Sequence, residues 1–271
     1  IASLKKESTG SGSLLPFKLD ITKDDSVKAA REFVEVNLGS KKFWAVVNNA
    51  GIFTCYGPAD WTGMEEYRLS FEVNCLGGIR VTDAFTDLLK QSRGRIVSVS
   101  SVAGRLSTIG TAAYSVAKYG VEAWMDSLRR ELKKYGIAVS IVEPGIFRAT
   151  NLLDETAMNR RVDYVWKKMS QERREEYGEQ YKNEFLEQWN ETMKSGSDRI
   201  DYVVDNYYHA VTAAHPRLRY QCGWDAILLW VPLSFLPTPI QDWILATLFA
   251  KSYARTPAAL KAGGKLHKKT N

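Results

Sequence analysis

Short apolar segments alternate with longer amphipathic segments through residues 14–145 of this 271-residue chain, and the alternation limits its fold more than any other feature. The apolar segments, which are typical of buried strands, span residues 14–21, 43–47, 95–99 and 137–142. Between them, apolar side chains recur at helical spacing over residues 22–38, 64–89 and 111–135. Strands that alternate with helices of this length form βαβ units, in which helices cover both faces of a parallel sheet. We therefore predict a doubly wound α/β fold.

Single residues mark the ends of the predicted helices. Thr22 offers a side-chain oxygen as the N-cap of the first helix, and Gly39 is suited to end it. The pair Gly77-Gly78 interrupts the second helix and indicates close packing or a bend. Gly136 is placed to cap the carboxyl end of the third helix. The helices are therefore expected to begin and end at these residues.

Composition excludes several classes of protein. With 45% hydrophobic and 25% charged residues, the chain is neither disordered, collagen-like nor a coiled coil. The chain has an odd number of cysteines, and they are widely spaced: Cys55, Cys75 and Cys222. We therefore expect no disulfide scaffold, and with only 3 histidines we expect no metal site. The net charge of +6 is concentrated near the C-terminus. This charge indicates either solubility or contact with an anionic membrane surface. Because no arginine-rich stripe is interleaved with aromatic residues, no nucleic-acid partner is expected.

The pattern changes after Gly145. Residues 160–194 are strongly charged and carry apolar side chains at four-residue steps, which predicts amphipathic helices that cover a substrate pocket. Residues 224–250 are very apolar, but Pro232, Pro237 and Pro239 interrupt them. No uninterrupted stretch reaches the ~20 apolar residues of a spanning helix. Two interpretations stay open: this segment lies in a membrane interface, or it is buried and closes a hydrophobic pocket.

Three polar side chains form a candidate catalytic group. Tyr114 and Lys118 are four residues apart on one predicted helix, so they share a face. A lysine cation beside a tyrosine favours the phenolate and lowers the phenol pKa toward neutrality, as general acid–base catalysis requires. Ser101 follows the strand at residues 95–99, at the sheet edge where open α/β folds bind ligands. There its hydroxyl can hydrogen-bond a substrate oxygen shared with Tyr114.

These residues belong to a larger set of motifs: Asn48-Asn-Ala-Gly51, Asn74, Ser101, Tyr114, Lys118 and Pro144-Gly145. In order and spacing the set resembles the short-chain dehydrogenase/reductase family, from residue 14 to the end of the chain. The resemblance implies a Rossmann-like doubly wound sheet and hydride transfer with a nicotinamide cofactor. It divides the single domain into a partial dinucleotide-binding core (residues 1–150), a helical substrate-covering insertion (151–215) and an apolar C-terminal segment with a basic tail (216–271).

The resemblance also implies a role for each matching residue. Tyr114 is expected to be the catalytic acid/base, Lys118 to lower its pKa and hold the cofactor ribose, and Ser101 to orient the substrate. Asn74 is expected to support a water-linked proton relay. The remaining cofactor-binding residues are expected to be Asp20 at the adenine amino group, Asn48, Ala50 and Gly51 beside the adenine ribose, and Pro144, Gly145, Ile146 and Thr150 beside the nicotinamide.

Later motifs are similar to those of one branch of the family, the retinol and hydroxysteroid dehydrogenases. They are Ile141-Val-Glu-Pro-Gly145, Tyr177-Gly178, Ala214-His-Pro216, Arg219-Tyr220 and Gly223-Trp-Asp-Ala226. This branch implies a lipophilic secondary or allylic alcohol as substrate, NAD as cofactor, and association with the endoplasmic reticulum membrane through residues 224–250. The alternative is an enzyme similar to mitochondrial 3-hydroxybutyrate dehydrogenase. NADP as cofactor and a homo-oligomeric state stay open.

Two features depart from the family pattern. Family members usually place a threonine soon after the proline-glycine pair, but the run here is one residue longer, so Ala149 or Thr150 takes that place. The glycine-rich phosphate loop is missing as well. Its only candidate, Thr9-Gly-Ser-Gly-Ser13, precedes a strand and lacks the third glycine, so it is expected to be a turn.

The order of the motifs places the first βαβ unit, with its glycine loop, upstream of Ile1. Without that unit the strand at residues 43–47 becomes an exposed apolar edge, which can pair with other chains. We therefore expect the polypeptide that begins at Ile1 to bind cofactor poorly and to aggregate. If the gene began at Ile1, a non-catalytic relative that keeps the fold would be favoured instead.

Overall fold

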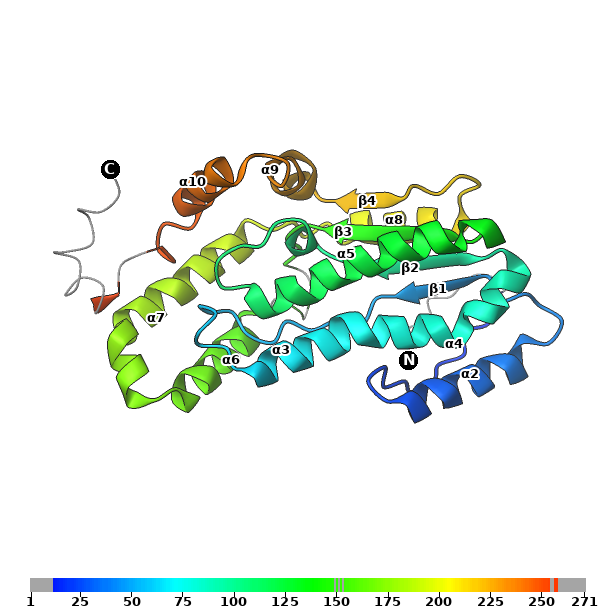
Figure 1. The fold of residues 1–271 in the computed structure, drawn as a ribbon, viewed down its shortest axis with the longest axis horizontal. Helices are drawn as coiled ribbons and strands as arrows, with labels where there is room; N and C mark the ends of the chain where they lie inside the picture. Colours follow the sequence, from blue (N-terminus) through cyan, green and yellow to red (C-terminus); the bar gives the residue numbers. More distant parts are fainter. Residues whose placement is uncertain (1–11, 149, 151, 153, 254–255, 258–271) are drawn as a thin grey trace.

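The structure, a computed structural model, describes residues 12–148, 150, 152, 154–253 and 256–257 (Figure 1). At its centre β1 (Ala45–Asn48), β2 (Arg95–Val99), β3 (Ala138–Pro144) and β4 (Arg219–Cys222) lie side by side in chain order. Every neighbouring pair of strands is parallel. The parallel sheet that the sequence predicts is confirmed, and the carboxyl ends of all four strands meet at one edge.

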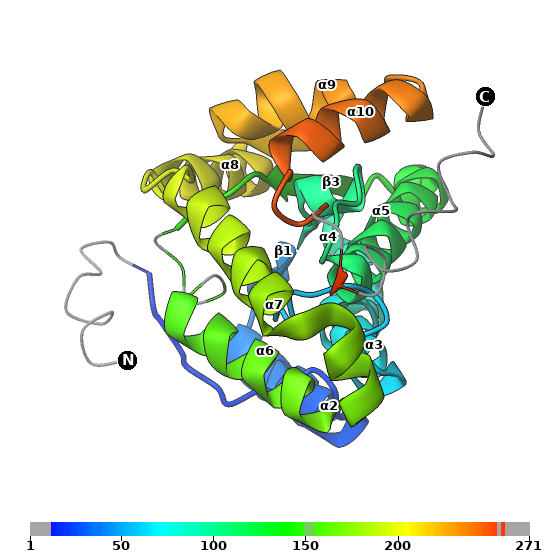
Figure 2. The ribbon, with the colours of Figure 1, turned by 90° about the vertical axis from the view of Figure 1, so that its left-hand side faces the viewer.

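Helices cover both faces of this sheet (Figures 1 and 2). α4 (Gly77–Ser92) and α5 (Ala112–Leu132) pack on one face, where α4 contacts β1 and β2 and α5 contacts β3. α8 (Asp201–Thr212) packs on the opposite face against β2, β3 and β4. α2 (Asp24–Leu38) lies against α4. The arrangement is the doubly wound fold expected from the alternating pattern.

The two faces of β2 belong to two separate clusters of the core. Ile96 packs with Leu89 of α4 and Met125 of α5, whereas the next residue, Val97, packs with Ala210 of α8. Successive side chains of a strand point to opposite faces, so a strand covered on both sides reads as a continuous apolar run. Burial of each such side chain stabilises the fold by ~1.5–3 kcal/mol.

The helix-ending glycines lie where the sequence predicts them. Gly39 follows α2, and Gly136, at φ 73°, ends a short 3₁₀ turn (Lys133–Tyr135) that extends α5. The predicted N-cap at Thr22 is wrong. The Thr22 amide and hydroxyl both donate to Asp20 Oδ1, at 2.9 and 2.7 Å, so the side chain closes a turn before the helix.

The strand predicted at residues 14–21 is not formed. Residues 12–20 have no regular secondary structure, and the side chains of Leu14, Leu15 and Phe17 are exposed. A strand exists only where its backbone pairs with another, and no strand of the described chain lies beside this segment. Phe17 instead packs on Phe33 of α2, with ring centroids 4.9 Å apart.

The amphipathic stretch at residues 64–89 forms three joined helical segments. α3 (Met64–Phe71) passes into a π-helical turn (Glu72–Leu76), which passes into α4. Gly77 begins α4 where Ile21 packs against it; a Cβ at Gly77 would lie 2.5 Å from Ile21 Cδ1. The close packing predicted for the glycine pair therefore occurs at its first member.

The later helices lie beyond the carboxyl ends of the strands (Figures 1 and 2). α6 (Glu155–Lys168) and α7 (Gln171–Lys194) are the helices predicted in this region. After β4, a π-helical turn (Ala226–Trp230), α9 (Val231–Leu233) and α10 (Thr238–Leu248) follow. Throughout the described chain, every helix is too short or too polar to cross a bilayer.

The two adjacent glycines of α4 give a test of this packing. We expect Gly77→Ala to destabilise the protein by ~1–2 kcal/mol, because the new methyl group overlaps Ile21. Gly78→Ala is the matched control, since its Cβ would meet Asn48 and Trp124 only at 3.6 Å or more. Alanine there should be neutral or stabilise the helix by up to ~1 kcal/mol. Urea denaturation of both variants measures the difference; equal effects would contradict the packing.

Candidate active site

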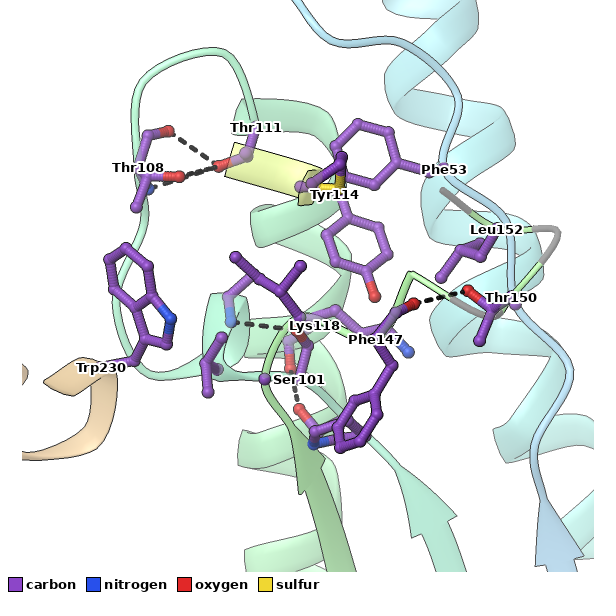
Figure 3. Close-up of a pocket in the computed structure, with 18 of the residues that line it drawn as sticks. Phe53, Ser101, Thr108, Thr111, Tyr114, Lys118, Phe147, Thr150, Leu152 and Trp230 are labelled. Carbon is purple, nitrogen blue, oxygen red and sulfur yellow. Dashed lines mark hydrogen bonds between the residues drawn. The ribbon is translucent and has the colours of Figure 1, made fainter. Parts of the chain in front are cut away.

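A cavity of about 360 Å³ lies at the carboxyl ends of the strands. Ser101, Tyr114 and Lys118 are among its polar lining residues. In Figure 3 the Tyr114 hydroxyl is directed into the space that Ser101, Lys118 and Phe147 border. The structure therefore brings together the three side chains that the sequence selects as a catalytic group.

Two local features place these side chains. Tyr114 and Lys118 lie one turn apart on the buried face of α5, where 7% and 2% of their surfaces are exposed. Ser101 follows β2 and begins a short 3₁₀ turn (Val102–Gly104), in which its Oγ accepts the Ala103 amide at 3.2 Å. The helix face and the strand end thus converge on the same cavity.

Lys118 is a buried cation with a backbone partner. Its Nζ donates to the Val99 carbonyl at 3.1 Å and lies 5.5 Å from the centre of the Tyr114 ring. Burial lowers the pKa of Lys118 to about 8, although the negative charge of Glu122 opposes the shift. Lys118 therefore stays mainly positive at neutral pH.

The pKa of Tyr114 departs from the expected direction. The sequence predicts that Lys118 lowers it, but burial raises the pKa of Tyr114 to about 12, and the hydrogen bond with Ser101 offsets only part of this shift. The physical reason is geometric, because the ammonium donates to Val99 and lies over the tyrosine ring. Desolvation of the phenolate consequently outweighs its attraction to the cation.

Asn74 lies in the π-helical turn and is buried. Its Oδ1 accepts the Ile52 amide at 2.8 Å, and its Nδ2 donates to the Ile52 carbonyl at 2.9 Å. The side chain therefore holds the loop after β1, which carries Gly51. Its expected part in a proton relay stays a prediction.

The expected cofactor residues divide between two cavities. Besides Tyr114 and Lys118, which are also expected to contact the cofactor, five of them border the large one: Gly51, Pro144, Gly145, Ile146 and Thr150. A second cavity of about 150 Å³ is bordered by Asn48, Ala50 and Asn74, and Asn49 borders both. The Asn48 amide donates to Thr82 at 2.8 Å and to Ser98 at 3.0 Å, so its side chain is engaged between α4 and β2.

Asp20 lies in the exposed turn before α2 and borders neither cavity, although its neighbours Leu19 and Ile21 border the smaller one. Its hydrogen bonds with Thr22 hold the pKa of the carboxyl below its usual range. Thr150 borders the large cavity, where its Oγ1 donates to the Phe147 carbonyl at 3.1 Å. Ala149 and the segment Thr9–Ser11 of the predicted glycine-rich turn lie outside the described residues.

Aromatic side chains that the sequence analysis did not single out form much of the wall. The Phe53 ring stacks on the Tyr114 ring with centroids 4.7 Å apart, and its centroid lies 5.2 Å from that of the Trp189 ring of α7. Trp230 and Phe249, from the apolar C-terminal segment, are buried and also border the cavity. Of the two interpretations left open for residues 224–250, closure of a pocket is the one that these two side chains follow. Composition predicts that aromatic side chains line the pocket, but only the contacts in the fold show which residues they are.

A buried ion cluster lies beside the candidate catalytic group, and sequence reasoning missed it. Arg219 of β4 donates to Glu122 of α5 and to Glu143 of β3, whose side chain is 0% exposed. Burial, and then the charge of Glu143, raise the pKa of Glu122. Arg105 completes the cluster at 3.3 Å from Glu143. The cluster joins the helix of Lys118 to β3, the strand that ends at Pro144. The spacing of Glu122, one turn after Lys118, was its only sequence signal.

Comparison with known proteins agrees with this geometry. The model of the family described as short chain dehydrogenase matches residues 1–161. A 3β-hydroxysteroid dehydrogenase of Caenorhabditis elegans is 46% identical over 254 residues, which are 92% of this chain and 65% of that protein. The 17-beta-hydroxysteroid dehydrogenase type 6 of Bos taurus is 42% identical, over 86% of this chain and 73% of that protein. Retinol dehydrogenase 16 of Mus musculus is 43% identical, over 84% and 71%.

Solved structures show the same fold. A short chain dehydrogenase/reductase from Burkholderia phymatum, crystallised with NAD, superposes with a TM-score of 0.68 at 20% identity. The match covers 86% of this chain and 77% of that one. At this identity the likeness concerns the fold alone. The chain spans about two thirds of the length of the nematode relative.

The depressed pKa of Lys118 predicts a specific dependence of stability on pH. Between pH 8 and 10.5 the unfolded lysine holds its proton while the folded one releases it, so stability rises with pH. Relative to Lys118→Met, the wild-type protein should gain about 1 kcal/mol per pH unit in this window. Guanidinium unfolding at several pH values measures the gain.

The exposed Lys133, at the end of the same helix, provides the control. Lys133→Met should leave the pH dependence unchanged. A wild-type protein and a Lys118→Met variant with parallel pH profiles would contradict the buried cation.

Proposed function

The chain belongs to the short-chain dehydrogenase family, and on this premise we propose that it is an NAD(P)-dependent oxidoreductase of lipophilic alcohols. The observation that supports the proposal most strongly is the convergence of Ser101, Tyr114 and Lys118 on one largely apolar cavity. Nothing in the packing of the fold requires a phenol, an ammonium and a hydroxyl to meet there, whereas proton transfer to or from an alcohol does.

The residues present fit the nicotinamide cofactor. Lys118 brings a buried donor into the cavity, and Gly51 leaves space that a side chain would fill, since a Cβ there would lie 3.1 Å from Asn74 Oδ1. The smaller cavity shares Asn49 with the large one and extends toward Leu19 and Ile21, on the side proposed for the adenine ribose. When bound, the nicotinamide supplies the acceptor or donor of the hydride. We propose NAD; NADP would use the same residues.

Within this proposal Tyr114 takes the hydroxyl proton during oxidation and returns it during reduction. Its pKa must fall below the value of about 12 that burial sets, and the hydrogen bond with Ser101 acts in this direction. We propose that the Lys118 cation, 5.5 Å from the centre of the ring, favours the phenolate as well. Ser101 holds the substrate oxygen next to the phenol. Lys118 keeps its positive charge at neutral pH, which favours the phenolate.

The cavity lining supports a lipophilic substrate. Among its described lining residues, Lys118 is the one charged side chain, and Phe53, Tyr56, Trp189 and Trp230 supply aromatic surface. A short hydroxy acid would need a second cation to pair with its carboxylate. A hydroxysteroid or retinol needs apolar wall, which agrees with the names of the relatives. We therefore favour these substrates over 3-hydroxybutyrate.

We further propose that the C-terminal segment contacts a membrane surface, in the endoplasmic reticulum or, as the alternative, in mitochondria. Several large apolar side chains of this segment are exposed to solvent: Trp224, Leu228, Phe235, Ile240, Trp243 and Leu248. Trp243 alone has 71% of its surface exposed. Exposed aromatic and aliphatic side chains on a short helix partition into the lipid interface. The distal part of the basic tail lies outside the described residues.

Substitution of the phenol tests the proposed reaction. In the full-length protein, Tyr114→Phe should lower kcat for hydroxysteroid or retinol oxidation by about 10²–10⁴-fold, because the proton acceptor is lost while the ring and its packing remain. The dissociation constant for NAD, from quenching of tryptophan fluorescence, should change less than about threefold.

Tyr119 provides the matched control on the same helix. It is half-exposed, and its hydroxyl donates to the Arg105 carbonyl outside the cavity. Tyr119→Phe should leave kcat near the wild-type value. Retained turnover by Tyr114→Phe would exclude the proposed mechanism, and preferred turnover of 3-hydroxybutyrate by the wild-type protein would favour the alternative substrate.

Sedimentation with anionic phospholipid vesicles tests the membrane contact. Replacement of Leu228, Phe235 and Trp243 by serine should reduce the bound fraction at least about tenfold, because each removes apolar surface that would enter the lipid. Tyr208→Ser is the control, since Tyr208 is equally exposed on α8. Equal loss in both variants would mean that residues 224–250 are not the contact.

A further inference from the structure

The segment Gly223–Asp225 follows β4, and the proposed function gives its side chains no role. Asp225 lies next to the large cavity and reaches two of its walls. Its Oδ2 accepts the Ile146 amide at 2.7 Å and the Trp230 Nε1–H at 3.2 Å. Ile146 belongs to the proposed nicotinamide side, and Trp230 belongs to the proposed substrate wall. One carboxylate thus joins both parts of the cavity.

Two glycines leave room for this carboxylate. A Cβ at Gly145 would overlap both carboxylate oxygens of Asp225, and a Cβ at Gly223 would lie 2.6 Å from Oδ1. Gly223 also has φ +97°, a conformation that side chains disfavour. The Gly145 amide donates to the Cys222 carbonyl at 2.9 Å. Two consecutive amides, of residues 145 and 146, are therefore held by the last residue of β4 and by the loop that follows it.

We propose that Asp225 is a positioning residue, which holds the segment Gly145–Ile146 and the Trp230 wall in a fixed relation. The inference rests on the proposed function, because it assigns that segment to the cofactor and that wall to the alcohol. Loss of the carboxylate frees the Ile146 amide and the indole N–H, and both walls then shift. The cofactor and the alcohol should therefore both bind more weakly, although Asp225 need not touch either one.

Two substitutions in the full-length protein separate the hydrogen bond from the charge. Asp225→Ala should raise the dissociation constant for NAD and the KM for a hydroxysteroid by about tenfold each, the size of one lost charge-assisted hydrogen bond. Asp225→Asn keeps an oxygen for the Ile146 amide, so it should restore NAD binding to within about threefold of wild type. Fluorescence quenching by NAD gives the first quantity without turnover.

Asp242→Ala is the matched control, because Asp242 is an exposed aspartate of α10. It should change neither constant. A dissociation constant for NAD that stays within twofold of wild type in Asp225→Ala would overturn the proposal. Failure of Asn to restore binding would also overturn it, since the hydrogen bond to Ile146 would then not be the cause.

A double-mutant cycle provides a readout that does not depend on activity. Gly145→Ala should lower the midpoint of urea unfolding, because its methyl group overlaps the Asp225 carboxylate. Addition of Asp225→Ala removes the overlap, so the double variant should lose less than the sum of the two single losses. Additive losses would overturn the contact between Asp225 and this segment. By contrast, a wild-type protein that binds no NAD would overturn the proposed function, whatever the cycle shows.

Discussion

One face of α5 buries Tyr114, Lys118 and Glu122 at successive turns, and the rest of the site depends on how these ionisable groups are partnered. A buried charge without a partner is costly. The ends of the strands supply the partners: the Val99 carbonyl for Lys118 and Arg219 for Glu122. The strand order that builds the core therefore also decides which groups surround this face of α5, and the sheet and the site cannot be changed independently.

Elements whose signal is local could be predicted from the sequence. β2 has the predicted bounds, and the short 3₁₀ turn that extends α5 ends at Gly136, the glycine that the pattern indicates. The segment at residues 14–21 has the same kind of apolar pattern, yet forms no strand, because a strand requires a neighbour that no local pattern reveals. The prediction of Thr22 as an N-cap is wrong for a related reason, because the Thr22 hydroxyl donates to Asp20 and does not cap the helix.

The candidate catalytic group was predictable because helical spacing joins Tyr114 to Lys118 and a strand end presents Ser101. The supporting residues were not. Asp225 contacts Ile146 from 79 positions away, and Arg219 contacts Glu143 from 76 positions away. The local sequence around Asp225 or Arg219 therefore does not indicate its partner. The pKa of Tyr114 was misjudged because a pairwise rule between phenol and ammonium ignores burial, which here has the larger effect. Electrostatics of this kind follows from the whole environment of a group.

The π-helical turn at Glu72–Leu76 holds one residue more per turn than α-helix would, and Asn74 reaches Ile52 from it. Removal of a single residue there would restore α-helix and leave α3 and α4 in about the same relative orientation, because the wide turn absorbs the extra residue. The apolar stripes of the two helices would then still face the same neighbours, but the Asn74 amide would lose the position from which it reaches Ile52 in the loop that carries Gly51. A change of one residue in length would thus act on the site and spare the core, so insertions and deletions in homologues should avoid these five positions.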